Sequence, residues 1–112
     1  MQSTELLKGT LQTIILNLLS NTDRMYGYEI TQHVKELSEG KLILTEGALY
    51  PTLHKLEAEG LVTTEKVAIG KRVRKYYRLT REGSSIVEIK LNEFKEYVKI
   101  VTQILKYKPV VT

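Results

Sequence analysis

The sequence predicts a mainly α-helical (α+β) fold, a winged helix-turn-helix with a long C-terminal dimerisation helix, from three observations. A slim amphipathic helix is indicated over residues 46–59, with Thr45 as a candidate N-cap and Gly60 where a C-cap glycine belongs. Two strand-like and strongly basic segments follow within residues 63–82. A heptad stripe of apolar residues then extends over residues 87–105.

The composition is that of one globular domain. The chain has 112 residues, of which 42% are hydrophobic and 27% charged. It contains no cysteine, which excludes disulfides and thiolate metal ligands and suits a reducing compartment. No signal-peptide pattern occurs and no apolar run reaches about 18 residues, so we expect a cytoplasmic protein. We expect one compact domain, with residues 1–80 forming the winged helix-turn-helix region and residues 81–112 the C-terminal helix and a short tail.

The N-terminal part predicts two helices. The first covers about residues 4–20, where apolar side chains occupy most of the circumference, so the helix must be covered on two sides. Residues 21–24 break it, and a second helix begins at Tyr26 and ends at residues 38–40. Its inward positions are Ile30, Val34 and Leu37. Residues 42–44 are short and apolar, which predicts a small strand or an extended link.

The third helix, over residues 46–59, has one narrow apolar stripe and a slim opposite face. The stripe consists of Leu49, Leu53 and Leu56. The opposite face carries Gly47, Pro51, His54, Lys55 and Ala58. Little on that face is bulky, so another surface can approach it closely, and a helix of this kind fits a DNA major groove about 12 Å wide.

The segment after this helix concentrates the positive charge of the chain. Residues 63–82 contain seven of the 17 basic residues and two acidic ones, a net charge of +5, against +4 for the whole protein. The basic residues are Lys66, Lys71, Arg72, Arg74, Lys75, Arg78 and Arg81. Residues 62–67 and 74–79 are predicted as strands linked by residues 68–72. Such a hairpin can straddle a phosphate backbone, although its charges could also serve only to keep an edge strand from aggregating.

The inventory of reactive groups argues against an enzyme. The only histidines are His33 and His54, the only aspartate is Asp23, and no phosphate-binding glycine loop occurs. Two isolated histidines without cysteine do not make a zinc site. We therefore expect no catalytic activity, no metal and no cofactor.

The C-terminal region predicts a long helix that begins after Thr80 as N-cap, with Glu82 in its first turn. Its apolar stripe steps by alternating intervals of four and three residues from Val87 to Leu105. A helix of about 25 residues is roughly 38 Å long, so its far half must project from so small a domain. A second copy is the simplest cover, and packing within the same monomer is the alternative. The predicted dimer interface comprises Leu11, Ile14, Leu18, Phe94, Val98, Val101 and Leu105.

With these residues placed, the chain resembles the PadR family of bacterial transcriptional regulators over residues 5–106. The matching motifs are Tyr26-Gly-Tyr-Glu-Ile30, Glu46-Gly-Ala-Leu-Tyr-Pro51, Leu53-x-x-Leu-Glu-x-x-Gly-Leu61, Arg74-Lys-Tyr-Tyr-x-Leu-Thr80 and Gly83. The resemblance implies a winged-helix homodimer, usually a repressor, that binds a two-fold symmetric operator. It also implies that the single C-terminal helix packs across the dimer against the first helix.

The resemblance also implies roles for particular aromatic residues. Tyr50 corresponds to a tyrosine that approaches the DNA backbone, and the alternative for it is a ring packed against the hairpin. Some short relatives bind planar drugs between the halves of the dimer with a tryptophan of the last helix, whereas this chain has no tryptophan. Phe94 and Tyr97 lie on that helix and are the candidates for contact with a small hydrophobic or aromatic effector.

The sequence thus predicts a sequence-specific DNA-binding regulator, a repressor that acts as a homodimer on a palindromic operator and is released by a small-molecule effector. Its predicted partners are double-stranded DNA and a second copy of itself, without a membrane. The predicted DNA contacts are Thr45, Tyr50, His54, Lys55, Lys71, Arg72, Arg74 and Lys75. The alternative is a winged-helix module that binds proteins and has no specific affinity for DNA.

Overall fold

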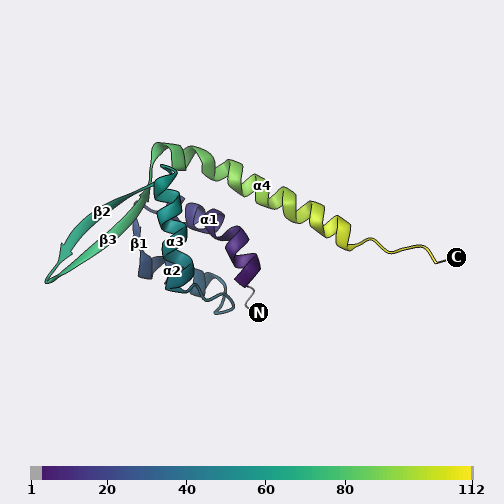
Figure 1. Ribbon diagram of the computed structural model, residues 1–112, viewed down its shortest axis with the longest axis horizontal. Coiled ribbons are helices and arrows are strands. Elements are labelled where there is room, and N and C mark those ends of the chain that lie inside the picture. Colours follow the sequence, from purple (N-terminus) through teal and green to yellow (C-terminus); the bar gives the residue numbers. More distant parts are fainter. Residues whose placement is uncertain (1–3, 112) are drawn as a thin grey trace.

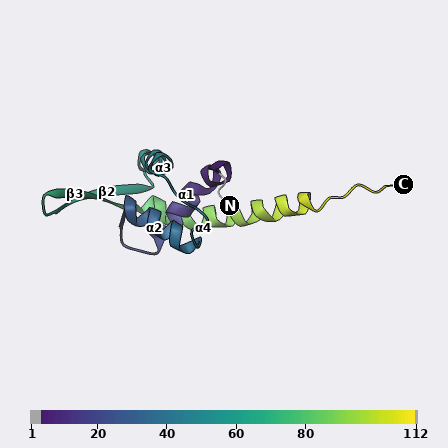
Figure 2. The same cartoon turned by 90° about the horizontal axis from the view of Figure 1, so that it is seen from below.

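The computed structural model describes residues 4–111, which form four helices and a three-stranded antiparallel sheet (Figure 1). In chain order the elements are α1 (Thr4–Ser20), β1 (Met25–Tyr26), α2 (Gly27–Leu37), α3 (Glu46–Ala58), β2 (Val62–Ile69), β3 (Arg72–Leu79) and α4 (Arg81–Leu105). Helices α1 to α3 gather together, while the β2–β3 hairpin, called the wing below, and helix α4 extend in opposite directions (Figures 1 and 2). The molecule is therefore elongated, with extents of 72 × 29 × 21 Å.

The winged helix-turn-helix prediction is confirmed, with one strand in a different place. Residues 42–44 form an extended link without a strand. The third strand is instead β1, which includes Tyr26, the predicted first residue of the second helix. It pairs with β3, Met25 opposite Tyr77 and Tyr26 opposite Tyr76, and gives the sheet order β1-β3-β2. A two-residue strand has too few residues to show an alternating pattern, so only its distant partner defines it.

The wing is longer and its turn tighter than predicted. Each of its strands has eight residues, and Ile69 pairs with Arg72. The predicted five-residue link is thus a two-residue loop of Gly70 and Lys71. Gly70 has φ +59°, a conformation that glycine adopts without steric cost and that type II′ hairpin turns require at this position.

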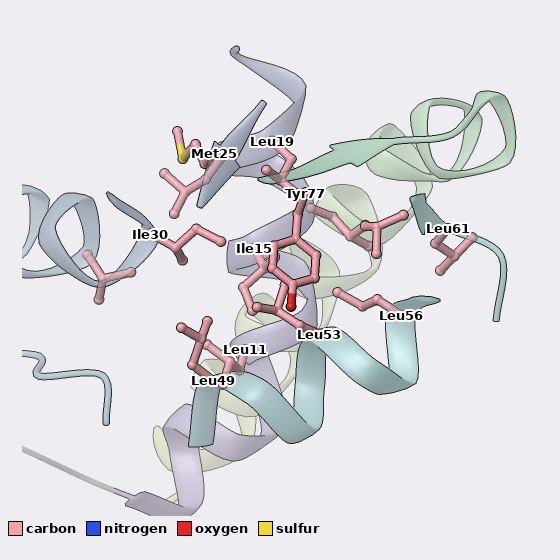
Figure 3. Close-up of a cluster of buried hydrophobic side chains, with 14 of the residues drawn as sticks. Leu11, Ile15, Leu19, Met25, Ile30, Leu49, Leu53, Leu56, Leu61 and Tyr77 are labelled. Atoms are coloured by element: carbon pink, nitrogen blue, oxygen red, sulfur yellow. The ribbon is translucent and has the colours of Figure 1, made fainter. Parts of the chain in front are cut away.

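The core lies between α1, α3 and the sheet, with the ring of Tyr77 among aliphatic side chains (Figure 3). The predicted stripe of Leu49, Leu53 and Leu56 is fully buried there. Helix α1 packs against α3, β3 and α4, which confirms that it is covered on two sides. Its buried residues are Leu11, Ile15, Leu16, Leu18 and Leu19.

Two predicted interface residues are buried, and one predicted core residue is exposed. Leu11 and Leu18, predicted at the dimer interface, are only 1% and 8% exposed because the core of the single chain covers them, so they have almost no area left for a partner. Ile14 is half-buried. Ile30 and Val34 face inward as predicted, whereas Leu37 is 72% exposed because it is the last residue of α2.

The end of α3 is fastened to the start of α4. Gly60, with φ +75°, lets α3 end in a Schellman arrangement in which Leu61 N donates to Leu56 O at 2.9 Å. Thr80 caps α4 as predicted, since its Oγ1 accepts from Gly83 N at 3.0 Å. The same hydroxyl donates to Gly60 O at 2.6 Å, and Thr80 N donates to Leu61 O at 3.1 Å. One threonine thus joins the two helices.

Helix α4 leaves the body of the protein after its first turns. Val87 is buried and Leu91 half-buried, but no residue from 92 to 111 is buried. Large apolar side chains of the outer half are exposed, including Phe94 (40%), Val98 (44%) and Leu105 (78%). The projection predicted from helix length is therefore confirmed (Figure 2).

Candidate nucleic-acid interface

The outer face of α3 is exposed along its whole length. His54 and Lys55 both point away from the buried leucine stripe and are exposed. Thr45 is the N-cap residue in an extended conformation, but its side chain makes no capping hydrogen bond. These three predicted DNA contacts are thus all exposed, with His54 and Lys55 on the side of α3 away from the core and Thr45 at its N-terminus.

Tyr50 lies where α3 passes the start of α2. A β-carbon added to Gly27 would be 2.4 Å from the Tyr50 hydroxyl oxygen, so the ring depends on the absence of a side chain there. Tyr50 is 36% exposed and lines a groove shared with residues of the wing. The tyrosine thus packs against α2 and keeps one edge open to that groove.

The two faces of strand β3 differ in chemistry because successive side chains point to opposite sides. One face carries Arg72, Arg74, Tyr76 and Arg78, and the other carries Val73, Lys75, Tyr77 and Leu79. Tyr77 points into the core, where burial raises its pKa above the ordinary value. The basic side chains therefore lie on both sides of the wing.

At the base of the wing, basic side chains form ion pairs with carboxylates. Glu65 accepts from Arg24 at 2.6 Å and from Arg78 at 3.0 Å, and Arg78 also lies 3.5 Å from Asp23. Arg78 belongs to the basic segment predicted from the sequence, whereas Arg24 lies outside it. Because Asp23 and Arg24 are far from Glu65 and Arg78 in the sequence, no local pattern could have revealed these pairs.

Arg74 is held by tyrosines of two strands. Its guanidinium carbon lies 4.0 Å from the centre of the Tyr26 ring, and its Nη1 donates to Tyr76 Oη at 3.4 Å. The Tyr26 and Tyr76 rings meet edge to face at 5.6 Å. The hydrogen bond to Tyr76 is the main cause that raises the pKa of Arg74, which keeps its charge fixed.

A groove of about 520 Å³ separates the wing from α2 and α3. It follows the edge of β3, which β1 pairs only at Tyr76 and Tyr77, so that the edge from Arg72 to Lys75 is open. The lining residues are Tyr26, Gly27, Tyr28, Tyr50, Ile69, Arg72, Val73, Arg74, Lys75 and Tyr77. Four of the predicted DNA contacts, Tyr50, Arg72, Arg74 and Lys75, thus come together in it. Lys71 lies in the exposed turn beyond its end.

A second groove, of about 490 Å³, lies between α1 and α4. Phe94 and Tyr97, the predicted effector contacts, both line it. Polar groups at its wall come from Glu5, Thr10, Thr13, Lys90 and Glu93. These polar residues could not be predicted as neighbours, because they belong to two helices far apart in the chain.

Among the described residues, no three histidine, aspartate or glutamate side chains come close enough together to hold a metal ion. None of the described helices is long and apolar enough to cross a membrane.

The three-helix core, the exposed third helix and the basic wing define a winged helix-turn-helix protein. A family model described as the transcriptional regulator PadR-like family matches residues 15–88. A protein of Lysinibacillus sphaericus, designated uncharacterized protein X, is 31% identical over 103 residues, which cover 90% of this chain and 93% of that protein. The transcriptional regulator YqjI of Escherichia coli is 32% identical over 98 residues, which cover 88% of this chain and 44% of YqjI.

A transcriptional regulator from Clostridium thermocellum has a similar structure, with a TM-score of 0.83 and 29% identity over 93% of this chain and 98% of that one. The chain therefore belongs to the PadR-like family of transcriptional regulators. It is a regulator and not an enzyme.

Proposed function

We propose that the protein is a sequence-specific DNA-binding repressor that acts as a homodimer. The observation that carries this proposal is the juxtaposition of an exposed slim helix face with a basic groove. Within residues 4–111, Lys71, Arg72, Arg74 and Lys75 form no ion pair with a carboxylate, whereas Arg24 and Arg78 do. Because residues 63–82 also carry a net charge of +5, the outer part of the wing offers several unpaired positive charges to phosphates.

In the proposed complex α3 enters the major groove and the wing follows the adjacent backbone. His54 and Lys55 reach base edges, because they are the long polar side chains of the exposed face. Gly47 and Ala58 allow the helix to approach closely. Thr45 and Tyr50, at the start and flank of α3, contact the sugar-phosphate backbone and fix the register.

The apolar outer half of α4 supports a homodimer. Phe94, Val98, Val101 and Leu105 form a stripe that is only partly covered within the single chain, and a second α4 or the exposed side of α1 can cover the rest. A two-fold symmetric dimer presents two copies of α3. Its operator is then a palindrome whose half-sites are about 34–36 Å apart, one helical turn of DNA.

The groove between α1 and α4 is the proposed effector site, with Phe94 and Tyr97 as stacking surfaces for an aromatic molecule. Because the same helices form the proposed dimer contact, an occupant there would change the separation of the two α3 helices. Release from the operator would follow from that change.

Selection of bound duplexes from a random DNA pool tests the proposed function. We expect a palindromic consensus, and an electrophoretic shift whose affinity falls steeply as salt rises. A reporter gene placed behind the selected site should be repressed by the wild-type protein. Absence of any salt-dependent DNA affinity would instead favour the winged helix as a protein-binding module.

A further inference from the structure

Two arginines on the outer face of the sheet rest on tyrosine rings, but their charges have different surroundings. Arg24 lies 4.0 Å from the centre of the Tyr76 ring and Arg74 lies 4.0 Å from that of Tyr26. Arg24 is paired with Glu65 at 2.6 Å. For Arg74, no carboxylate of the described chain lies within ion-pairing distance. The fold thus positions both guanidinium groups and neutralises only one.

The contacts of Arg74 fix its plane and leave most of its donors unused. The Tyr26 ring covers one face, and Nη1 donates to Tyr76 Oη. A guanidinium has five N–H donors, and the remaining four have no described protein acceptor. A stacked arginine of this kind is pre-organised, since its side-chain entropy is already lost before a ligand arrives.

The surroundings of Arg74 select for an anion. It lines the groove between the wing and α2 together with Arg72 and Lys75, while the Tyr28 and Tyr50 rings form other parts of the lining. The charge of Glu29 has a small influence on Arg74, and the Glu29 carboxylate accepts a hydrogen bond from Tyr26 N at 3.1 Å at the start of α2. A peptide strand could pair with the open edge of β3, but three cations around that edge favour a polyanion.

We infer that Tyr26 and Arg74 form a pre-organised binding site for a backbone phosphate of DNA, in which Arg74 makes the contact and Tyr26 is a positioning residue. This inference rests on the proposed function. It assigns to Tyr26, in the motif before α2, a role that no local pattern in the sequence indicates. Arg74 supplies a planar fork that matches two phosphate oxygens, and Tyr26 holds that fork toward the groove.

A double-mutant cycle on one selected duplex tests the site. Arg74→Ala should weaken binding to all DNA sequences and flatten the slope of log affinity against log salt by about 0.9. Tyr26→Leu should weaken binding roughly three- to tenfold, the range expected from losing a cation–π contact. In the Arg74→Ala background Tyr26→Leu should have no further effect, because the ring acts only through the arginine.

Three matched variants complete the experiment. Tyr26→Phe keeps the ring and should bind within about twofold of wild type. Arg74→Lys keeps the charge without the planar fork, and should retain the salt slope while losing affinity. Arg78→Ala removes an arginine that is paired with Glu65, so the salt slope should not change.

The outcomes separate this inference from the proposed function. If the wild-type protein binds no DNA, the proposed function fails and the phosphate site with it. If the wild type binds but Arg74→Ala leaves the salt slope unchanged, only the phosphate site is overturned. The same holds if Tyr26→Leu costs as much affinity without Arg74 as with it, since the ring would then act on the fold or on DNA directly. Thermal unfolding of each variant shows whether it still folds. Because Arg74 is partly exposed, Arg74→Lys should fold normally, so the phosphate site can be tested even if another variant does not fold.

Discussion

The α-carbon of Gly83 lies directly against the main-chain carbonyl of Leu61, so that a β-carbon at position 83 would be 2.0 Å from the Leu61 oxygen. Gly83 is in the first turn of α4, and Leu61 directly follows the glycine that ends α3. With Thr80 bonded to both segments, this approach makes the connection between α3 and α4 a close backbone contact. A side chain at position 83 therefore cannot be accommodated by a rotamer change.

We expect Gly83→Ala to destabilise the protein by at least about 2 kcal/mol, because backbone atoms must move to admit the methyl group. Gly9→Ala is the matched control, since Gly9 also lies in a helix and a β-carbon there meets nothing within 4 Å. That control should stabilise the protein by roughly 0.5–1 kcal/mol. Chemical denaturation of the two variants measures both effects, and equal stabilities would refute the close contact.

The buried phenol of Tyr77 predicts a loss of stability in alkali. Burial raises its pKa in the folded protein, so between the unfolded pKa of about 10 and the folded value the unfolded chain has released a proton that the folded chain retains. The contribution of Tyr77 to the free energy of unfolding should therefore be complete below about pH 10 and decrease as the pH rises further. Tyr77→Phe should remove this contribution. Identical pH profiles for wild type and Tyr77→Phe above pH 10, measured by denaturation, would show that the phenol does not contribute.

Substitutions on the exposed face of α3 should change the preference for particular base pairs more than the overall affinity for DNA. Lys55→Ala and His54→Ala should relax the preference for particular base pairs, each in both half-sites, by roughly 1–3 kcal/mol of discrimination. Affinity for non-specific DNA should change little, since phosphate contacts dominate it. Parallel binding selections on wild type and each variant measure this. Unchanged base preferences combined with weaker binding would identify both side chains as phosphate contacts.

If the apolar stripe of α4 forms the dimer interface, a carboxylate introduced into that stripe should prevent dimerisation. Val98→Glu should raise the dimer dissociation constant at least about a hundredfold, because an unpaired charge in an apolar interface costs several kcal/mol. Gln103→Glu adds the same charge on the opposite side of α4 and should leave the dimer intact. Sedimentation at micromolar concentration distinguishes the two, and a wild-type protein that is already a well-folded monomer would contradict the proposed dimer.

The elements that local periodicity defines were predicted closely. The bounds of α1 and α4 and the buried stripe of Leu49, Leu53 and Leu56 follow from the helical repeat of apolar residues. The strand β1 was missed because its definition depends on pairing with residues about 50 positions away. The wing turn was predicted too long, since Arg72 and Val73 join the strand through the register of their partners and not through their own sequence pattern.

In the candidate site, too, the positions along a helix could be predicted from the sequence, whereas the contacts between distant residues could not. His54 and Lys55 could be placed on the outer face of α3 by counting residues from the leucines. The pairing of Arg78 with Glu65 and the stacking of Arg74 on Tyr26 could not, because each joins side chains whose proximity only the sheet creates. Leu11 and Leu18 were assigned to the dimer because their helix is apolar on most sides, and periodicity alone does not say which side a neighbouring element of the same protomer covers.

The projection of α4 means that one continuous helix is held by tertiary packing at only one end. A peptide helix of a dozen residues is marginal in water, so residues 92–105 derive little stability from their own backbone hydrogen bonds. In a lone protomer, protection of amide hydrogens against exchange should therefore decline steadily from Val87 toward Leu105. Any partner that covers the stripe would raise the protection of the outer turns in proportion to its occupancy. The exchange profile along this single helix is thus a direct readout of how much of the protein is assembled.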